Sequence, residues 1–191
     1  MTKEINNNTA LLLIDIQNDY FPGGTMELFA PNEVAEKAKT VLSYFRDHAM
    51  PVVHIQHIAV QEGAGFFLPE TKGAEIHESV QPLKNEKVIV KNFPNSFRET
   101  GLLNYLKEKS ISNLVICGMM TDVCVSSTTR AATDFGFHNT VISDAVTTRD
   151  RHFEGKIISA QQITESFLAG LNALGGLYAT IESSEIYLKK E

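Results

Sequence analysis

One cysteine of this chain, Cys124, stands where its thiol could act as a nucleophile. Thr121 and Asp122 just before it carry the side-chain oxygens that begin helices, and the sequence predicts a helix from about Val123 through Ala132. The thiol would then lie in the first helical turn, where free N–H groups and the positive end of the helix dipole lower the pKa of a thiol. Because the thiolate is the reactive form, the position favours a nucleophile over the alternative of a small buried apolar residue.

Two charged residues, Asp15 and Lys91, follow apolar runs that are typical of buried strands. Asp15 closes the run Thr9–Ile14, and Lys91 closes the run Lys87–Val90. An unpaired charge at such a place is costly, but the carboxyl-terminal edge of a parallel sheet is also where ligands bind. Asp15 is therefore either a cap held by backbone amides or a working acid–base group. Lys91 is expected to be partly buried and to need a carboxylate partner.

Strands and helices alternate along the chain. This alternation predicts an α/β fold, a three-layer α/β/α sandwich with a six-stranded parallel sheet in the Rossmann-like order 3-2-1-4-5-6. We expect a single domain over residues 1–191. The expected strands are Thr9–Ile14, Val52–Ile58, Lys87–Val90, Leu114–Cys117, Thr140–Ser143 and Tyr178–Ile181, and the expected helices are Asn32–Met50, Thr100–Lys109, Val123–Ala132 and Phe153–Leu174.

The predicted strand order brings the three reactive residues to one edge of the sheet. Strands 1 and 4 are neighbours with the switch point between them, so Asp15 and Cys124 should meet at the crevice that binds ligands. Lys91 would start two strands from Asp15, about 10 Å away, which its long side chain could largely span. Cys117, in the strand that Gly118 is expected to end, is by contrast predicted to be a buried structural residue.

Composition limits the partners of the protein. The net charge of −6 argues against nucleic acid or an anionic membrane as a partner, since both bind basic surfaces. The opening residues MTKEINNN do not resemble a secretory signal, and the apolar runs are too short to cross a bilayer. Two cysteines do not make a disulfide framework. We therefore expect a cytoplasmic protein that acts on a small molecule.

Three motifs carry a family resemblance, LLLIDIQNDYF around Asp15, VIVKNFPNSF around Lys91, and VICGMMTDVCVSSTTRAATDFGF around Cys124 followed by VISDA. In this order, and over Thr9–Ile181, the chain resembles the isochorismatase-like cysteine hydrolases. The resemblance implies that Asp15, Lys91 and Cys124 form a catalytic triad. Some members of the family lack the cysteine, and its presence here points to the amidase branch. The resemblance also implies a homo-oligomer, a dimer or larger.

The chemistry that the resemblance implies is covalent hydrolysis of an amide or related carbonyl compound without a cofactor. Asp15 would take the thiol proton of Cys124 while Lys91 holds the charges, and the thiolate would attack the carbonyl carbon. Backbone N–H groups of Met120 and Cys124 would stabilise the oxyanion, and the peptide bond Met119–Met120 would be cis. Asp15 would then protonate the leaving amine, and water would hydrolyse the thioester.

The substrate pocket is expected to involve the segment Ala59–Pro82, because a long segment without periodicity is typical of a functional loop. The adjacent rings of Phe66 and Phe67 either pack under this loop or form a pocket wall, and we favour the wall. The expected pocket residues are Gln17, Tyr20, Phe66, Phe67 and Phe97. The sequence does not encode the identity of the substrate.

Other functions remain open at this point. They are vinyl-ether hydrolysis of the isochorismatase type with Asp15 as the acid, a nicotinamidase, and a non-catalytic small-molecule-binding domain. A redox thiol protein is a further alternative, but the sequence has no CxxC motif and Cys117 is expected to be buried.

No metal site is expected. The nicotinamidase branch carries an Asp-x-His pair on its second strand and a further His in the next loop, whereas this region is VVHIQHI, without a carboxylate. His54 and His57 are three residues apart, so in a strand they should point to opposite faces. A loop-built site of His57, His77 and a carboxylate such as Glu62 or Glu70 is the alternative.

Overall fold

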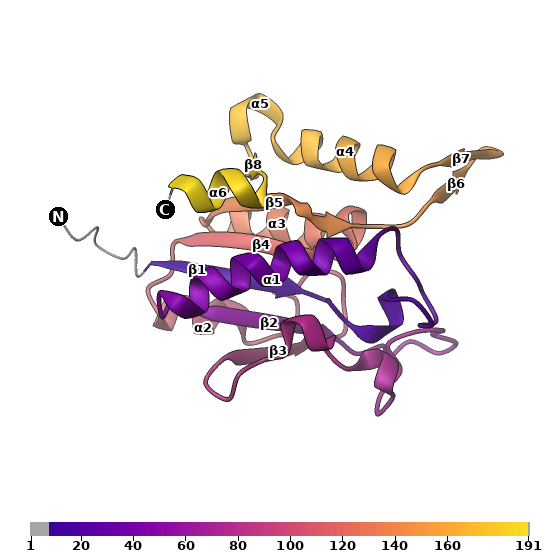
Figure 1. Ribbon diagram of the computed structural model, residues 1–191, viewed down its shortest axis with the longest axis horizontal. Helices are drawn as coiled ribbons and strands as arrows, with labels where there is room; N and C mark the ends of the chain where they lie inside the picture. Colours follow the sequence, from indigo (N-terminus) through magenta and orange to yellow (C-terminus); the bar gives the residue numbers. More distant parts are fainter. Residues whose placement is uncertain (1–7, 191) are drawn as a thin grey trace.

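A six-stranded parallel sheet forms the centre of the molecule, as seen in a computed structural model that describes residues 8–190 (Figure 1). The strands lie in the order β3-β2-β1-β4-β5-β8, so the predicted sheet order is confirmed, with β8 as the sixth strand. The strands are β1 (Thr9–Ile14), β2 (Val52–His57), β3 (Lys87–Lys91), β4 (Asn113–Met119), β5 (His138–Thr147) and β8 (Thr180–Glu182).

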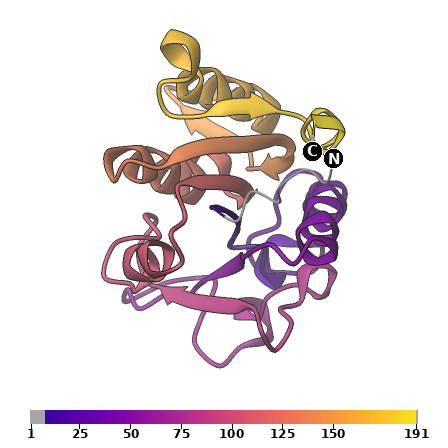
Figure 2. The ribbon, with the colours of Figure 1, turned by 90° about the vertical axis from the view of Figure 1, so that its left-hand side faces the viewer.

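Helices cover both faces of the sheet, which confirms the predicted three-layer sandwich (Figure 2). Side chains alternate along β1, so Leu11 and Leu13 pack into one core while Leu12 and Ile14 pack into the other. The first core lies under α1 (Pro31–Asp47) and α6 (Ser184–Lys190), and the second under α2 (Leu102–Glu108), α3 (Ser126–Asp134) and α4 (Ala160–Leu171), which α5 (Ala173–Gly176) follows.

The strand β4 does not end at Gly118 as expected from the sequence, but continues to Met119. Gly118 pairs with Ile14 in the ladder between β4 and β1, and a β-carbon on Gly118 would collide with the Ile14 carbonyl oxygen. Its φ of +139° is also a conformation that side chains rarely allow. Glycine here therefore permits the close approach of the two strands whose ends carry Asp15 and Cys124.

The turn after β4 also differs from the predicted helix of Val123–Ala132. A π-helical turn, η4 (Thr121–Val125), comes first and α3 follows it. Asp122 does not cap this helix, because its carboxylate accepts hydrogen bonds from the Thr148 hydroxyl at 2.5 Å and from Arg151 Nε at 2.9 Å. A guanidinium is a stronger hydrogen-bond partner for a carboxylate than a single backbone N–H, which explains why Asp122 pairs with Arg151. The π-helical turn itself is of a kind that is frequent at functional sites.

The region before α4 forms a hairpin rather than the start of the predicted helix Phe153–Leu174. Strands β6 (Arg151–Phe153) and β7 (Lys156–Ile158) pair antiparallel and project from the body of the molecule (Figure 1). Glu154 and Gly155 both have positive φ, as a two-residue hairpin turn requires. The helix α4 starts only after Ser159, which forms a capping box with Gln162.

The segment between β2 and β3 contains two 3-10 turns, η2 (Lys72–Ala74) and η3 (Glu78–Val80), and a third turn, η1 (Asn18–Tyr20), follows β1. Asn18 joins these segments, since its amide donates to the Lys72 carbonyl at 2.7 Å. Within residues 8–190, none of the helices is long and apolar enough to cross a membrane. The expected single domain, homo-oligomer and cytoplasmic location stay predictions.

Candidate active site

The ends of three elements bring Asp15, Lys91 and Cys124 together. Asp15 directly follows β1, Lys91 is the last residue of β3, and Cys124 lies in η4. The Lys91 ammonium nitrogen is 2.7 Å from Asp15 Oδ2 and donates a hydrogen bond to Cys124 Sγ at 3.4 Å. The predicted convergence is confirmed, and the three residues are only 0 %, 1 % and 4 % exposed, respectively.

Asp15 is not a cap held by backbone amides. Its own N–H donates to the Ile55 carbonyl and its carbonyl accepts from the Gln17 N–H, both at 3.0 Å. Among the residues that the structure describes, no backbone amide reaches its buried carboxylate, and the cation beside it is Lys91. Its φ of 52° is uncommon for a residue with a side chain and is typical of functional positions. A carboxylate with unused lone pairs in this setting can take or give a proton.

The Cys124 thiol is kept protonated at rest. Burial raises the pKa of Cys124, the Asp15 carboxylate raises it further, and the Lys91 ammonium offsets only part of this. The sequence predicts a lowered pKa from a helix start, and that prediction is wrong for the resting site because the thiol is withdrawn from water and faces a carboxylate. Reaction at Cys124 therefore requires a proton acceptor.

The Lys91 ammonium remains charged although it is buried. Burial by itself would lower the pKa of Lys91, but the charge of the Asp15 carboxylate and the hydrogen bond to Cys124 outweigh it and raise the pKa. The site therefore holds a fixed positive charge between a proton acceptor and a potential nucleophile.

A fourth group, His57, contacts the same ammonium. His57 and Lys91 are register partners at the ends of β2 and β3, and Lys91 Nζ is 2.8 Å from His57 Nδ1. Burial and the Lys91 charge lower the pKa of His57, and Asp15 offsets part of the shift. From the sequence, His57 is considered only as a metal ligand. The sequence signal for this contact is that His57 lies near the end of the predicted strand Val52–Ile58 and Lys91 directly follows the neighbouring predicted strand Lys87–Val90.

Gln17 holds the backbone rather than a substrate, which corrects its expected place in the pocket. Its amide nitrogen donates to the carbonyls of His57 at 2.9 Å and Ala74 at 2.7 Å, and its oxygen accepts the His57 N–H at 2.7 Å. The side chain is completely buried. Both hydrogens of the Gln17 amide are therefore used. They pair the peptide carbonyls of His57 and Ala74, which need hydrogen-bond partners because they are withdrawn from water.

The ligand atoms that could gather around a metal ion here already surround an ammonium. Atoms of Asp15, His57 and Cys124 lie within 4.8 Å of one another, and Lys91 Nζ is within 2.7–3.4 Å of each. This is the one group of its kind among the described residues, so His77 does not gather with loop carboxylates. His54 faces away from the site, as expected, and contacts Glu86 at 2.8 Å. The predicted absence of a metal stays a prediction.

An aromatic cluster packs beside this group at His57, whose ring centre is 5.9 Å from that of Phe67. The rings of Tyr20 and Phe67 are 4.6 Å apart, and Phe66 contacts both. Burial is the main cause that raises the pKa of Tyr20, and the Asp15 carboxylate raises it further. The loop is anchored there by Asp19, whose carboxylate accepts the Phe67 N–H at 2.6 Å.

Phe97, an expected pocket residue, lies in the same core cluster as Cys124, and its role in a substrate pocket stays a prediction. Its ring packs against Phe135 at 5.1 Å and Phe137 at 6.0 Å in the second core, which accounts for its burial. The apolar residues around it in the sequence are typical of a pocket and of a core alike.

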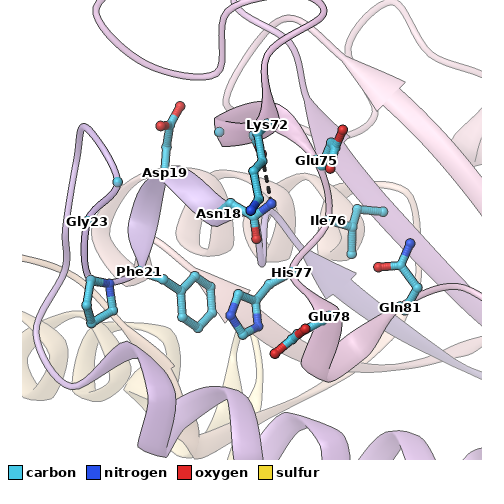
Figure 3. A pocket seen from close by; sticks show the side chains of 13 residues that line it. Asn18, Asp19, Phe21, Gly23, Lys72, Glu75, Ile76, His77, Glu78 and Gln81 are labelled. Carbon is cyan, nitrogen blue, oxygen red and sulfur yellow. Dashed lines mark hydrogen bonds between the residues drawn. The ribbon is translucent and has the colours of Figure 1, made fainter.

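A hollow of about 570 Å³ lies beside η1 and the loop that carries η2 and η3 (Figure 3). Phe21 and His77 stack within it at 3.6 Å between ring centres, with Lys72, Glu75 and Glu78 around them. None of Asp15, Lys91 and Cys124 lines this hollow. These three side chains therefore lie outside the hollow, in a buried part of the protein.

Comparisons with known proteins agree with this architecture. A family model described as the isochorismatase domain matches residues 9–172. The uncharacterized isochorismatase family protein YddQ of Bacillus subtilis is 48% identical over 181 residues, which cover 95% of this chain and 99% of the relative. Streptothricin hydrolase of Streptomyces noursei is 28% identical over 177 residues, or 93% of this chain and 61% of that protein. A crystal structure named for the isochorismatase hydrolases, from Oleispira antarctica, matches with a TM-score of 0.91 and 41% identity over 99% of each chain.

Proposed function

The chain belongs to the isochorismatase family of hydrolases, and we propose that it is a cysteine-dependent hydrolase of a small amide or related C–N bond. The observation that carries this proposal is the Lys91 ammonium, which contacts both the Asp15 carboxylate and the Cys124 sulfur inside the protein. A thiol, a proton acceptor and a fixed cation in contact are the parts that covalent catalysis by cysteine needs.

The first half of the reaction forms a thioester. Asp15 takes the thiol proton, and the Lys91 ammonium stabilises the thiolate that results. The sulfur attacks the substrate carbonyl carbon, and the backbone N–H groups of Met120 and Cys124 stabilise the oxyanion. As the C–N bond breaks, Asp15 returns the proton to the leaving amine. These steps explain why a thiol of raised pKa can still react, since the proton acceptor is part of the site.

The second half releases the acid. Asp15, again ionised, takes a proton from water, and the hydroxide attacks the thioester carbonyl. The thiolate leaves and recovers a proton from Asp15, which restores the resting site. The aromatic rings of Tyr20, Phe66 and Phe67 are proposed to shape the substrate pocket, because they contact one another and Phe67 packs against His57.

Support for a C–N bond over a vinyl ether comes from the position of the sulfur. Acid-catalysed vinyl-ether hydrolysis needs Asp15 as a proton donor and gives no role to a thiol hydrogen-bonded to Lys91.

Turnover by the wild-type protein and by Cys124→Ala tests the proposal directly. The substrates are a panel of small primary amides, carbamoyl amino acids and ureas, with release of the amine or ammonia as the readout. We expect hydrolysis of at least one class by the wild-type protein and none by the variant. Cleavage of a vinyl-ether substrate by both proteins, with no amide turned over, would instead favour the isochorismatase-type reaction.

A further inference from the structure

The position of the Lys91 ammonium depends on a side chain outside the three proposed catalytic residues. Lys91 is the last residue of β3, and its side chain crosses the end of β2 to reach Asp15, which directly follows β1. His57 is the residue at that end of β2, and it is the register partner of Lys91. We propose that His57 is a positioning residue, whose neutral imidazole accepts a hydrogen bond from Lys91 and holds the ammonium between Asp15 and Cys124.

The three N–H groups of the ammonium match three acceptors. Lys91 Nζ is 2.7 Å from Asp15 Oδ2, 2.8 Å from His57 Nδ1 and 3.4 Å from Cys124 Sγ. An ammonium has three N–H donors and no acceptor, so Lys91 can hydrogen-bond His57 and Cys124 while its charge pairs with Asp15. The contact with His57 therefore requires an unprotonated Nδ1, and the single proton of the neutral ring lies on Nε2. Without His57, one buried N–H of the ammonium would lose its acceptor.

Gln17 holds the backbone of His57 through both the N–H and the carbonyl group of that residue. The Gln17 amide accepts the His57 N–H at 2.7 Å and donates to the His57 carbonyl at 2.9 Å. The same amide donates to the carbonyl of Ala74, the last residue of η2, which holds the loop against the end of β2. In this proposal the buried Gln17 holds the backbone of His57, and His57 in turn holds the Lys91 ammonium.

Protonation of His57 would remove the contact. A protonated ring donates from both nitrogens, so it would place a second cation against the Lys91 ammonium. The charged and titratable groups facing His57 are Lys91 at the end of β3, Asp15 directly after β1, and Cys124 in η4. Burial and Lys91 together keep the pKa of His57 below its ordinary value, which preserves the acceptor near neutral pH. When acid protonates His57, the Lys91 ammonium should therefore no longer be held in position by this hydrogen bond.

Nitrogen-15 NMR of the histidine rings tests the hydrogen bond without a substrate. We expect His57 in the Nε2–H tautomer, with a pKa below its ordinary value, and we expect that pKa to rise in Lys91→Met. His48, which is exposed directly after the end of α1, serves as the control, because its ring signals should be the same in the wild type and in Lys91→Met. A proton on Nδ1 of His57, or a His57 pKa that is the same in both proteins, would overturn the proposal.

Two substitutions separate the acceptor from the shape of the ring. His57→Phe keeps a ring without an acceptor, and His57→Asn keeps an acceptor near the place of Nδ1 but cannot titrate. The readout is the rate at which iodoacetamide alkylates Cys124, measured against pH. We expect alkylation to slow about tenfold in His57→Phe and to recover to within about threefold of wild type in His57→Asn. The part of the wild-type pH profile that reports His57 should be absent in His57→Asn and present in the control His77→Asn.

This inference deepens the proposed function, and the two can fail separately. If Cys124→Ala still hydrolyses amides, the proposed function fails while the NMR result can still support the Lys91–His57 contact. If both His57 variants are alkylated at the wild-type rate and with the wild-type pH profile, the positioning role of His57 is wrong even where Cys124→Ala is inactive.

Discussion

Lys91 and Asp15 form an ion pair of 2.7 Å although neither side chain is exposed to water. They come from strands that are separated by β2, so only the long lysine side chain allows the contact. Removing two charges from water costs more than their attraction usually returns, and a pair of well-packed apolar residues would stabilise such a place as well or better. The pair is therefore better explained by the chemistry at Cys124 than by the stability of the fold.

The first prediction follows from the cost of breaking this pair. Lys91→Met should destabilise the protein by about 3–5 kcal/mol, because Asp15 is left as an uncompensated buried charge. Adding Asp15→Asn should restore most of that loss while leaving the protein inactive. Urea unfolding of the wild type, both single variants and the double variant measures the coupling between the two residues. Single and double variants of equal stability would contradict the view that the charges are buried together.

Cys124→Ala should abolish hydrolysis while the fold remains intact. The alanine side chain fits the place of the thiol, and the loss is expected because Cys117, the other cysteine, is completely buried inside β4. The matched control is Cys117→Ala, a change at a completely buried thiol inside β4 that should keep most of the activity. Rates near wild type for Cys124→Ala, with circular dichroism unchanged, would exclude the thiol mechanism.

Asp15→Asn should slow the chemical step by about 10²–10⁴-fold, since an amide can hold a hydrogen bond but cannot accept the thiol proton. A single-turnover experiment with a chromogenic amide separates this step from product release. The affinity for the substrate should change much less than the rate. An unchanged single-turnover rate would remove Asp15 from the reaction.

The strands, their order and the convergence of Asp15, Lys91 and Cys124 follow from the sequence because apolar runs and their terminal charges are local signals. The roles of Gln17 and His57 could not be predicted in this way. Their hydrogen bonds join residues 40 and 34 positions apart in the sequence, and only the folded sheet brings them together. Gly118 is misread for the same reason, since a glycine that ends a strand and one that permits a close neighbour look alike in a sequence.

The protein should keep its activity after dialysis against a strong chelator. The Lys91 ammonium already provides the positive charge among Asp15, His57 and Cys124, so a divalent ion would meet a fixed cation there. The measurement is the turnover rate before and after dialysis, together with elemental analysis of the purified protein. Activity that is lost on dialysis and restored by zinc, manganese or iron would contradict the metal-free prediction and favour a nicotinamidase-like site.

The last prediction concerns acid stability and depends on Glu86, far from the reaction. Burial alone would raise the pKa of Glu86, but hydrogen bonds from Arg46, from the Leu83 N–H and from His54 outweigh it and lower the pKa from 4.5 to about 2. Because the folded-state pKa is below the unfolded one, this carboxylate stabilises the fold fully above pH 4.5, and the contribution disappears as the pH falls toward 2. The shift corresponds to stabilisation on the order of 3 kcal/mol, at a side chain that is 6% exposed.

Glu86→Gln should therefore lower the melting temperature clearly at neutral pH, by a difference that shrinks below pH 4.5 and is nearly gone close to pH 2. Thermal unfolding of both proteins across this range provides the measurement. Glu99→Gln is the matched control, because that carboxylate is paired with Arg98 on the surface and is 68% exposed, where ion pairs contribute little. A melting-temperature difference for Glu86→Gln that stays constant from neutral to acid pH would mean that the substitution acts through packing and not through the charge of Glu86.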